Sequence, residues 1–266
     1  MNINAKTGAR PASRVLLSLL AIVALLVGAG AAMNARAQTL SKERIAEIVA
    51  SPDRSAADRN NDVRRKPEQI LAFIGVRPGM VALDIASGGA YTTELLARAV
   101  GPTGRVYGQS APARAGTTVT AAQRLAERAR NPAAGNMFAV ERQFVDPVPS
   151  EIAPGSLDLA TLMFNYHDMG FLESGRMQMN QAVFAALKSG GIYVVADHSG
   201  RPGTGISEST TLHRVEEAFV RKEIEAAGFK LVDEGTFLRN PSDPRDKYTP
   251  EPPQPKDEFI LKFVKP

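Results

Sequence analysis

The sequence predicts an α/β protein with a doubly wound, mostly parallel sheet of seven strands, and two observations lead to this prediction. Five apolar strand patterns alternate with amphipathic helix patterns, which is typical of parallel strands joined by crossover helices. Two more strand patterns, at 229–238 and 258–266, close the chain, and a Pro-rich loop without a helix separates them. We therefore expect these last two strands to form an antiparallel pair.

Apolar periodicity and helix-ending residues place the elements along the chain. Ile45, Ile48 and Val49 lie at helical spacing and predict a helix at 40–51, and the charge-dense segment 52–67 is expected to be a solvated linker. The elements that follow are expected as helix 67–76, strand 80–86, helix 91–100, strand 104–110, helix 121–130, strand 138–145, strand 156–164, helix 173–188, strand 192–197 and helix 212–229. Proline in a first turn and glycine after a last turn mark several of these boundaries.

The N-terminus has the residue order of a secretory signal. Three basic residues precede an uncharged apolar run at 15–30, and small residues follow at Ala35 and Ala37. We therefore expect cleavage between Ala37 and Gln38 and export of the protein to the periplasm or the medium. The alternative is an uncleaved N-terminal membrane anchor, because the apolar run is just long enough to span a bilayer.

Charge and cysteine content narrow the classes of partner. The formal net charge is +4, but four of the 32 basic residues lie in the first 37 positions, which leaves 28 against 28 acidic residues. A neutral body gives no reason to expect nucleic acid, and after signal cleavage none to expect a membrane. The absence of cysteine excludes disulfides and thiol catalysis. The expected organisation is a signal peptide at 1–37, an N-terminal helix and polar linker packing on the domain at 38–66, and one domain at 67–266.

A run of small residues joins the first predicted strand to the next helix. Asp84 ends that strand, "ASGGA" follows, and a helix pattern begins at Tyr91. Ligands of doubly wound sheets bind beyond the carboxyl ends of the strands, where small residues let them approach the backbone and free N–H groups of a helix. A dinucleotide fingerprint would need glycine where Tyr91 stands, and a P-loop would need Gly-Lys-Ser/Thr, so both are excluded.

This junction resembles motif I of the class I S-adenosylmethionine (SAM) methyltransferases, in which an acid is followed by alternating small residues. Here these are Asp84, Ala86, Gly88 and Ala90. The similarity extends through "VRPGMVALDIASGGAYTTELLARAVGPTGRVYGQ", and "ALKSGGIYVVADH" is similar to the family's turn into its fifth strand. From about residue 40 onward the chain also resembles a bacterial subfamily of predicted, often exported methyltransferases, notably in "FNYHDM" and "VVADHS". The resemblance implies a Rossmann-like methyltransferase fold with SAM as cofactor.

The resemblance also implies roles for individual residues. Asp84 would orient the cofactor's amino group, directly or through water, and the backbone of 86–90 would line its methionine moiety and ribose. Gln109 stands where an acid normally binds the ribose hydroxyls, so a charge-assisted hydrogen bond is lost. Asp146 either matches an acid that reads the adenine amino group or caps the turn before Pro147. The expected cofactor-binding residues are Asp84, Ala86, Ser87, Gly88, Gly89, Tyr91, Gln109, Asp146 and Asn165.

Two of the three histidines follow neighbouring predicted strands. His167 comes after the fourth strand and His198 after the fifth, so both should lie at the same sheet edge as motif I, next to Asp168 and Asp197. One interpretation is acid–base work, in which either histidine removes a proton from the methyl acceptor. A second is a divalent metal held by these four side chains, but their spacing matches no metal signature and we expect none. A third interpretation is that these histidines only cap a neighbouring element or pack in the core.

Tyr166 precedes these residues and either stacks on a substrate or packs under the loop. The expected catalytic residues are Tyr166, His167, Asp168 and His198. The Gly-rich segment 199–207 is expected to be a mobile lid or a plain surface loop.

Taken as a whole, the sequence favours SAM-dependent methyl transfer to a small-molecule acceptor by an exported enzyme. The alternative is a non-catalytic or repurposed methyltransferase fold that binds another small ligand outside the cytoplasm, with or without a metal. Two features support the alternative: export in an unfolded state delivers no bound cofactor, and Gln109 replaces the usual acid. A nicotinamide oxidoreductase is disfavoured by Tyr91 and by the same missing acid.

Overall fold

A computed structural model describes residues 1–2, 38–249 and 256–266. Thr39–Pro266 form one compact unit, and the expected signal peptide with its cleavage site lies outside the described residues apart from Met1, Asn2 and Gln38. Over the described ranges, no helix combines the length and the apolar character needed to cross a membrane.

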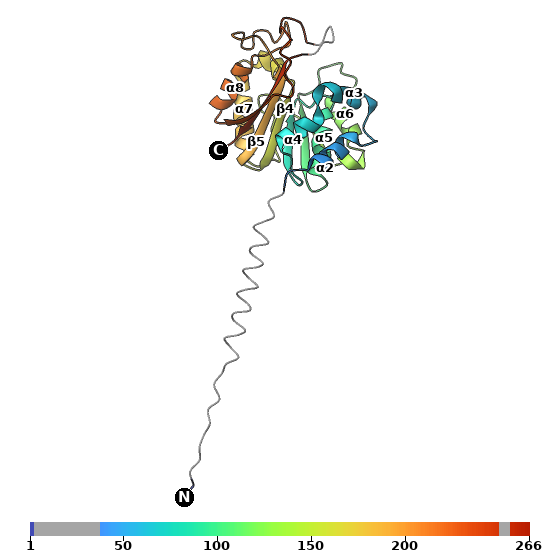
Figure 1. The fold of residues 1–266 in the computed structure, drawn as a ribbon, viewed down its shortest axis with the longest axis vertical. Coiled ribbons are helices and arrows are strands. Elements are labelled where there is room, and N and C mark those ends of the chain that lie inside the picture. Colours follow the sequence, from blue (N-terminus) through green and yellow to red (C-terminus); the bar gives the residue numbers. More distant parts are fainter. Residues whose placement is uncertain (3–37, 250–255) are drawn as a thin grey trace. The chain divides into compact units, whose positions relative to one another are not determined.

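A seven-stranded sheet runs through the centre of this unit (Figure 1). Its strands are β1 (Val81–Ile85), β2 (Arg105–Ser110), β3 (Met137–Glu141), β4 (Leu157–Met163), β5 (Leu187–His198), β6 (Lys230–Gly235) and β7 (Glu258–Val264). They lie in the order β3-β2-β1-β4-β5-β7-β6. The first five run parallel, and β7 is antiparallel to both β5 and β6. The predicted fold class, including the antiparallel C-terminal pair, is confirmed.

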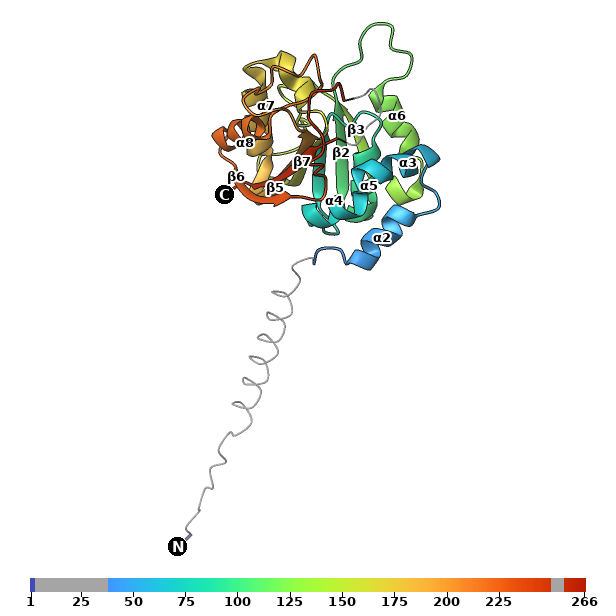
Figure 2. The same cartoon turned by 45° about the horizontal axis from the view of Figure 1, so that its top comes forward.

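Helices cover both faces of the sheet (Figure 2). One layer holds α7 and α8, and the other holds α2 and α4 to α6, with α3 beside them. The bounds are α2 (Lys42–Ala50), α3 (Ala56–Arg65), α4 (Pro67–Ile74), α5 (Tyr91–Val100), α6 (Ala121–Arg128), α7 (Gly175–Ala186) and α8 (Glu217–Ala226), with 3-10 turns η1 (Pro132–Ala134) and η2 (His167–Leu172).

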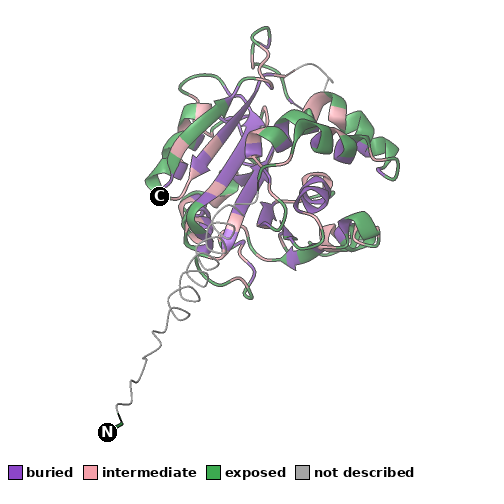
Figure 3. Ribbon diagram, turned by 60° about the horizontal axis from the view of Figure 1, so that its bottom comes forward, coloured by how far each residue is buried: buried purple, intermediate pink, exposed green. Residues whose placement is uncertain are grey.

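The central strands of the sheet are largely buried (Figure 3), and strict alternation along them divides the buried residues between two separate cores. Successive residues of a strand point to opposite faces, so one residue packs under α4 and α5 and its neighbour packs under α7 and α8. The pairs that divide in this way are Ala82 and Leu83, Leu159 and Ala160, Val194 and Val195, and Ile260 and Leu261. Because a slip of one residue would exchange the two cores, this pattern fixes the pairing of the strands.

The main departure from the sequence prediction is the segment 52–67, which was expected to be a linker. It contains α3, whose first turn is capped by the Ser55 side chain accepting a hydrogen bond from the backbone N–H of Asp58. Its sequence, "AADRNNDVRR", has no apolar stripe, so periodicity gave no sign of a helix. Two smaller differences are that α8 begins only at Glu217, not at 212, and that β5 begins already at Leu187.

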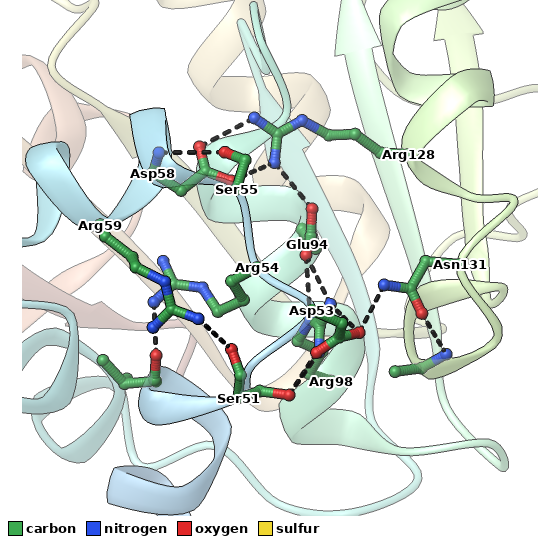
Figure 4. A network of polar contacts seen from close by, with 12 residues as sticks. Ser51, Asp53, Arg54, Ser55, Asp58, Arg59, Glu94, Arg98, Arg128 and Asn131 are labelled. Carbon is green, nitrogen blue, oxygen red and sulfur yellow. Dashed lines mark hydrogen bonds and ion pairs between the residues drawn. The ribbon is translucent and has the colours of Figure 1, made fainter.

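Ion pairs replace apolar burial in holding α3 and the loop before it to the domain (Figure 4). Arg128 of α6 contacts Asp58 at 2.6 Å and Glu94 at 2.7 Å, and Arg98 of α5 contacts Glu94 at 2.8 Å and Asp53 at 2.9 Å. The carboxylates of Asp58 and Glu94 are largely buried. Removing one partner of such a pair leaves an uncompensated buried charge, which lowers the free energy of unfolding by about 3–5 kcal/mol.

Candidate active site

In the loop between β1 and α5, every second residue from 86 to 90 has a left-handed backbone conformation. Ala86, Gly88 and Ala90 have φ of 56°, 53° and 62°. An alanine in this region costs about 1–2 kcal/mol relative to its ordinary conformation, and such strain is concentrated at functional sites. Hydrogen bonds hold the loop: the Ser87 N–H donates to the Gln109 carbonyl at 2.8 Å, and the Asn165 amide donates to the Ala86 carbonyl at 3.4 Å.

Asp84 lies at the base of this loop, almost fully buried. Each carboxylate oxygen accepts one hydroxyl hydrogen bond of 2.7 Å, from Thr93 and from Thr161. Burial raises the pKa of Asp84 to about 6, although both hydroxyls act in the opposite direction. A carboxylate oxygen has more than one acceptor direction, so Asp84 can still accept from a ligand's ammonium group.

A cavity of about 200 Å³ opens beside the loop. It is lined by Arg65, Asp84, Ile85, Ala86, Ser87, Gly88, Gly89, Tyr91, Thr92, Met163 and Asn165. The structure thus brings together every expected cofactor-binding residue except Gln109 and Asp146. A larger cavity of about 630 Å³ lies at the start of β2 and β3, near Arg105 and Phe138, and contains none of the expected site residues.

Gln109 and Asp146 lie outside the cavity lining. Gln109 is fully buried; its Oε1 accepts from the Ala86 N–H at 3.1 Å, and its Nε2 donates to the Arg142 carbonyl at 2.6 Å. Its amide therefore braces the motif loop against the residue that follows β3. Asp146 is exposed and pairs with Arg142.

Arg65, at the end of α3, is a cavity residue that sequence reasoning missed. Its guanidinium lies 4.6 Å from the Phe164 ring and 5.3 Å from the Tyr91 ring. Its Nε is buried without a hydrogen-bond partner, and no carboxylate of the described residues forms an ion pair with it. Burial and the neighbouring Arg64 lower the pKa of Arg65 to about 10, so it remains cationic at neutral pH. Arg65 is thus a cation without an ion-pair partner among the described residues, and Glu258 and Asp84 attract it only from a distance.

The position of Arg65 depends on α3 being docked. Asp62, one turn earlier, receives a bidentate contact from Arg54 at 2.7 and 2.8 Å and a hydrogen bond from the Tyr91 hydroxyl at 2.6 Å. Tyr91 is the first residue of α5, directly after the motif loop. The helix that carries Arg65 is thus tied to the loop that forms the other side of the cavity.

His167 and His198 meet at the carboxyl edge of β4 and β5, with their ring centres 5.4 Å apart. His167 is buried, and its Nδ1 lies 2.6 Å from Asp197 Oδ1. Burial alone would lower the pKa of His167, but Asp197 and Asp168 outweigh it and raise the pKa to about 10. His198 is also buried, which lowers its pKa below the usual value, and its Nδ1 lies 2.8 Å from Glu258 Oε1. Of the two, His198 is therefore the uncharged imidazole.

The third histidine joins the same group, which the sequence did not indicate. The His213 ring centre lies 5.3 Å from that of His167, and its Nδ1 lies 3.3 Å from Asp168 Oδ1. His213 was expected to open a helix, but it stands before α8 with a left-handed φ of 51°.

Tyr166 takes the second of the two roles considered for it. Its side chain is fully buried, donates to Glu223 Oε2 at 2.7 Å and accepts from the Asn180 amide at 3.1 Å. It packs under the loop that follows β4.

The Gly-rich segment 199–207 is held to the start of α8. The N–H groups of Gly203 and Gly205 donate to the carboxylate of Glu216 at 3.0 and 2.9 Å.

Comparison with known proteins addresses the fold. No protein-family model and no curated protein matches the chain. A SAM-dependent methyltransferase from Aquifex aeolicus matches with a TM-score of 0.56 and 15% identity over 85% of this chain and 100% of the other. The N-methyltransferase NodS from Bradyrhizobium japonicum matches with 0.55 and 15% over 79% and 99%, and the cyclase SpnF with 0.55 and 17% over 79% and 81%.

These similarities agree with the strand order and with the family resemblance of the motif loop. The presence of a cyclase among the matches shows that the same fold carries more than one chemistry, so the fold does not fix the reaction. The chain has the fold of the class I SAM-dependent methyltransferases.

Proposed function

We propose that the protein is a SAM-dependent methyltransferase that acts on a small-molecule acceptor. The observation that carries this proposal is the pairing of charges in the motif-loop cavity. Arg65 supplies a cation whose Nε has no hydrogen-bond partner, and Asp84 supplies a buried carboxylate that can accept further hydrogen bonds. Opposite charges in one small cavity suit the carboxylate and ammonium groups of an amino-acid end, such as the methionine end of SAM.

The size of the cavity limits how much of the cofactor it would enclose. Sites that enclose a whole drug-sized ligand have volumes of about 300–1,000 Å³. The 200 Å³ beside the motif loop is smaller, so it would enclose the amino-acid end, and the rest of SAM would lie along the exposed part of the loop. Gly88 and Gly89 are exposed on this loop, so the backbone is open to a ligand there.

In the reaction, bound SAM supplies an electrophilic methyl group. Arg65 would hold the cofactor's carboxylate and Asp84 would accept from its ammonium group, and the strained motif loop is already shaped for close contact. We assign His198 as the base: its Nδ1 lies 2.8 Å from Glu258 Oε1, although the two atoms are not aligned for a hydrogen bond, and its Nε2 would accept the proton of the acceptor's O–H or N–H. Its ring lies 5.7 Å from the Phe164 ring, and Phe164 in turn contacts Arg65. Most of the rate then derives from alignment of the two reactants.

Calorimetric titration with SAM and with its demethylated product tests the proposal. Arg65→Met removes the charge but keeps most of the side chain, and Arg59→Met, exposed on the same helix, is the matched control. A hydrogen bond to a charged group contributes about 1.5–3 kcal/mol, so Arg65→Met should weaken binding about 10- to 150-fold while Arg59→Met leaves it unchanged. No SAM binding up to millimolar concentration, or equal binding by both variants, would overturn the proposal.

Methionine serves as the competing ligand in the same experiment. The alternative function, a repurposed fold that binds another small ligand, is favoured by the Arg65 and Asp84 pair, because these charges would accept any amino acid. If methionine binds as tightly as SAM, the site recognises the amino-acid end alone and methyl transfer loses its support. A preference for SAM of tenfold or more supports a site for the whole cofactor.

Export forms part of the proposal and rests on the charged, apolar and small-residue order of positions 1–37. Fusing these residues to a reporter that is active only outside the cytoplasm tests it. Replacing Ala35 and Ala37 by bulky residues should then leave the signal attached, whereas a fully anchored protein would show no change in mass.

A further inference from the structure

We propose that His167, Asp168 and His213 form a binding site for a divalent transition-metal ion. The three side chains each offer a ligand atom, and these atoms lie within 4.8 Å of one another. Asp168 Oδ1 is the centre of the group, 3.3 Å from His167 Nε2 and 3.3 Å from His213 Nδ1.

These distances match what a metal requires, and the ion would replace the proton on His167 Nε2 that faces Asp168. Zinc lies about 2.0–2.1 Å from nitrogen and about 2.0–2.2 Å from carboxylate oxygen, and a tetrahedron of that size separates its ligand atoms by about 3.3–3.4 Å. Two of the three separations already have this value. The separation between the two histidines can close by a small rotation of His213, whose side chain is 31% exposed.

Asp197 holds His167 in the orientation that a metal ligand needs. It accepts from His167 Nδ1 at 2.6 Å and from the His167 backbone N–H at 2.7 Å, which turns Nε2 toward Asp168. Asp197 is itself fully buried and also accepts from the His198 backbone N–H at 2.7 Å, so it has little freedom to move. Metal-binding histidines almost always donate their second ring N–H to such a carboxylate.

The group also has an open side. His167 is buried, whereas the side chains of Asp168 and His213 are 46% and 31% exposed. An ion can therefore enter from solvent and keep a coordination position for water or for a substrate oxygen, as in catalytic sites with three protein ligands.

The backbone of His213 has a left-handed conformation. Its φ of 51° lies in the left-handed region, which histidine adopts more often than most residues other than glycine, and the Tyr248 ring packs against it at 5.0 Å. Strained backbone of this kind is concentrated at ligand sites. Here it directs the ring of His213 toward Asp168.

The donor set indicates the class of metal. Two imidazoles with one carboxylate suit zinc, iron or nickel in the divalent state, whereas magnesium and calcium prefer oxygen ligands alone. The site lies next to His198 and is separate from the cavity that holds Arg65 and Asp84. It does not depend on the proposed methyl transfer.

Titration of the purified full-length chain, without a histidine tag and after treatment with chelator, tests the site. Zinc chloride is the probe, and magnesium chloride is the comparison. We expect one zinc per chain and no measurable magnesium binding. His213→Ala and Asp168→Asn should each weaken zinc binding at least tenfold, and Asp197→Asn should weaken it about 10- to 100-fold through His167.

His198→Ala is the matched control, because it removes a neighbouring histidine that is not a ligand. It should keep the affinity of the wild type. Cobalt absorption in the visible range gives a second readout, with intense bands expected for the wild type and lost in His213→Gln. Absence of zinc binding at 100-fold molar excess, or binding that survives both His213→Ala and Asp168→Asn, would overturn the assignment.

Discussion

Replacing Asp84 by Asn should stabilise the protein, and more at high pH than at low pH. Burial raises the pKa of Asp84 from 3.8 to about 6 despite the hydrogen bonds from Thr93 and Thr161. A carboxyl whose pKa is higher in the folded state favours folding when protonated. The ionised form therefore lowers the free energy of unfolding: the loss begins as pH rises above 3.8 and is complete above about pH 7.

The two pKa values set the magnitude. The difference between 3.8 and about 6 corresponds to about 3 kcal/mol at pH 8, and at pH 5 the same relation gives roughly half of that. Asn carries no charge and keeps one oxygen acceptor. The stabilisation by Asp84→Asn should therefore be about 1–2 kcal/mol larger at pH 8, which is about 2–8 °C in Tm for a domain of this size.

Chemical denaturation of both proteins at pH 5 and pH 8 measures this difference. Asp246→Asn, at an exposed position, is the matched control and should show no such pH dependence. If Asp84→Asn gives the same change at both pH values, or destabilises more at pH 8, the ionised carboxylate is not penalised by burial. The nearby Arg65 would then be compensating it fully.

Three further changes test the packing around the site. Ala90→Gly relieves a left-handed φ and should raise the free energy of unfolding, measured by chemical denaturation, by up to about 1 kcal/mol. Its control, Ala99→Gly inside α5, should lower the free energy of unfolding by about 1 kcal/mol. Equal effects of the two substitutions would contradict backbone strain at Ala90. Tyr166→Phe removes a buried hydroxyl and should lower the same quantity by about 1–3 kcal/mol without changing the SAM dissociation constant. Arg128→Met leaves Asp58 buried and unpaired, so it should cost about 3–5 kcal/mol and increase hydrogen exchange in α3; unchanged exchange would refute the role of this pair.

The fold was predictable because each central strand carries a complete local signal. The apolar runs are bounded by turns, and the missing crossover helix between the last two strands dictates their antiparallel pairing. The motif loop was predictable for the same reason, since small residues directly after a strand and before a helix leave few structural alternatives. These signals all lie within about ten residues of the position they describe.

Arg65 and His213 were not predictable because their positions depend on contacts between distant segments. Arg65 reaches the cavity only because α3 docks through pairs such as Asp58 with Arg128, which are 70 residues apart. The sequence of α3 shows only a run of charges, which is equally typical of a solvated linker. His213 lies before α8 because Val215 forms a bridge to Ser199, and no local pattern indicates this.

Gln109 shows how the structure reverses an inference drawn from sequence. If it occupied the ribose-binding position, Gln109→Glu would restore the usual acid and tighten SAM binding. In the structure its Nε2 donates to the Arg142 carbonyl and its Oε1 accepts from the Ala86 N–H, and the side chain is fully buried. Glutamate has no donor for that carbonyl and would add a buried charge. Gln109→Glu should therefore loosen the motif loop, lowering both Tm and SAM affinity in melting and titration experiments. Tighter SAM binding would restore the ribose interpretation.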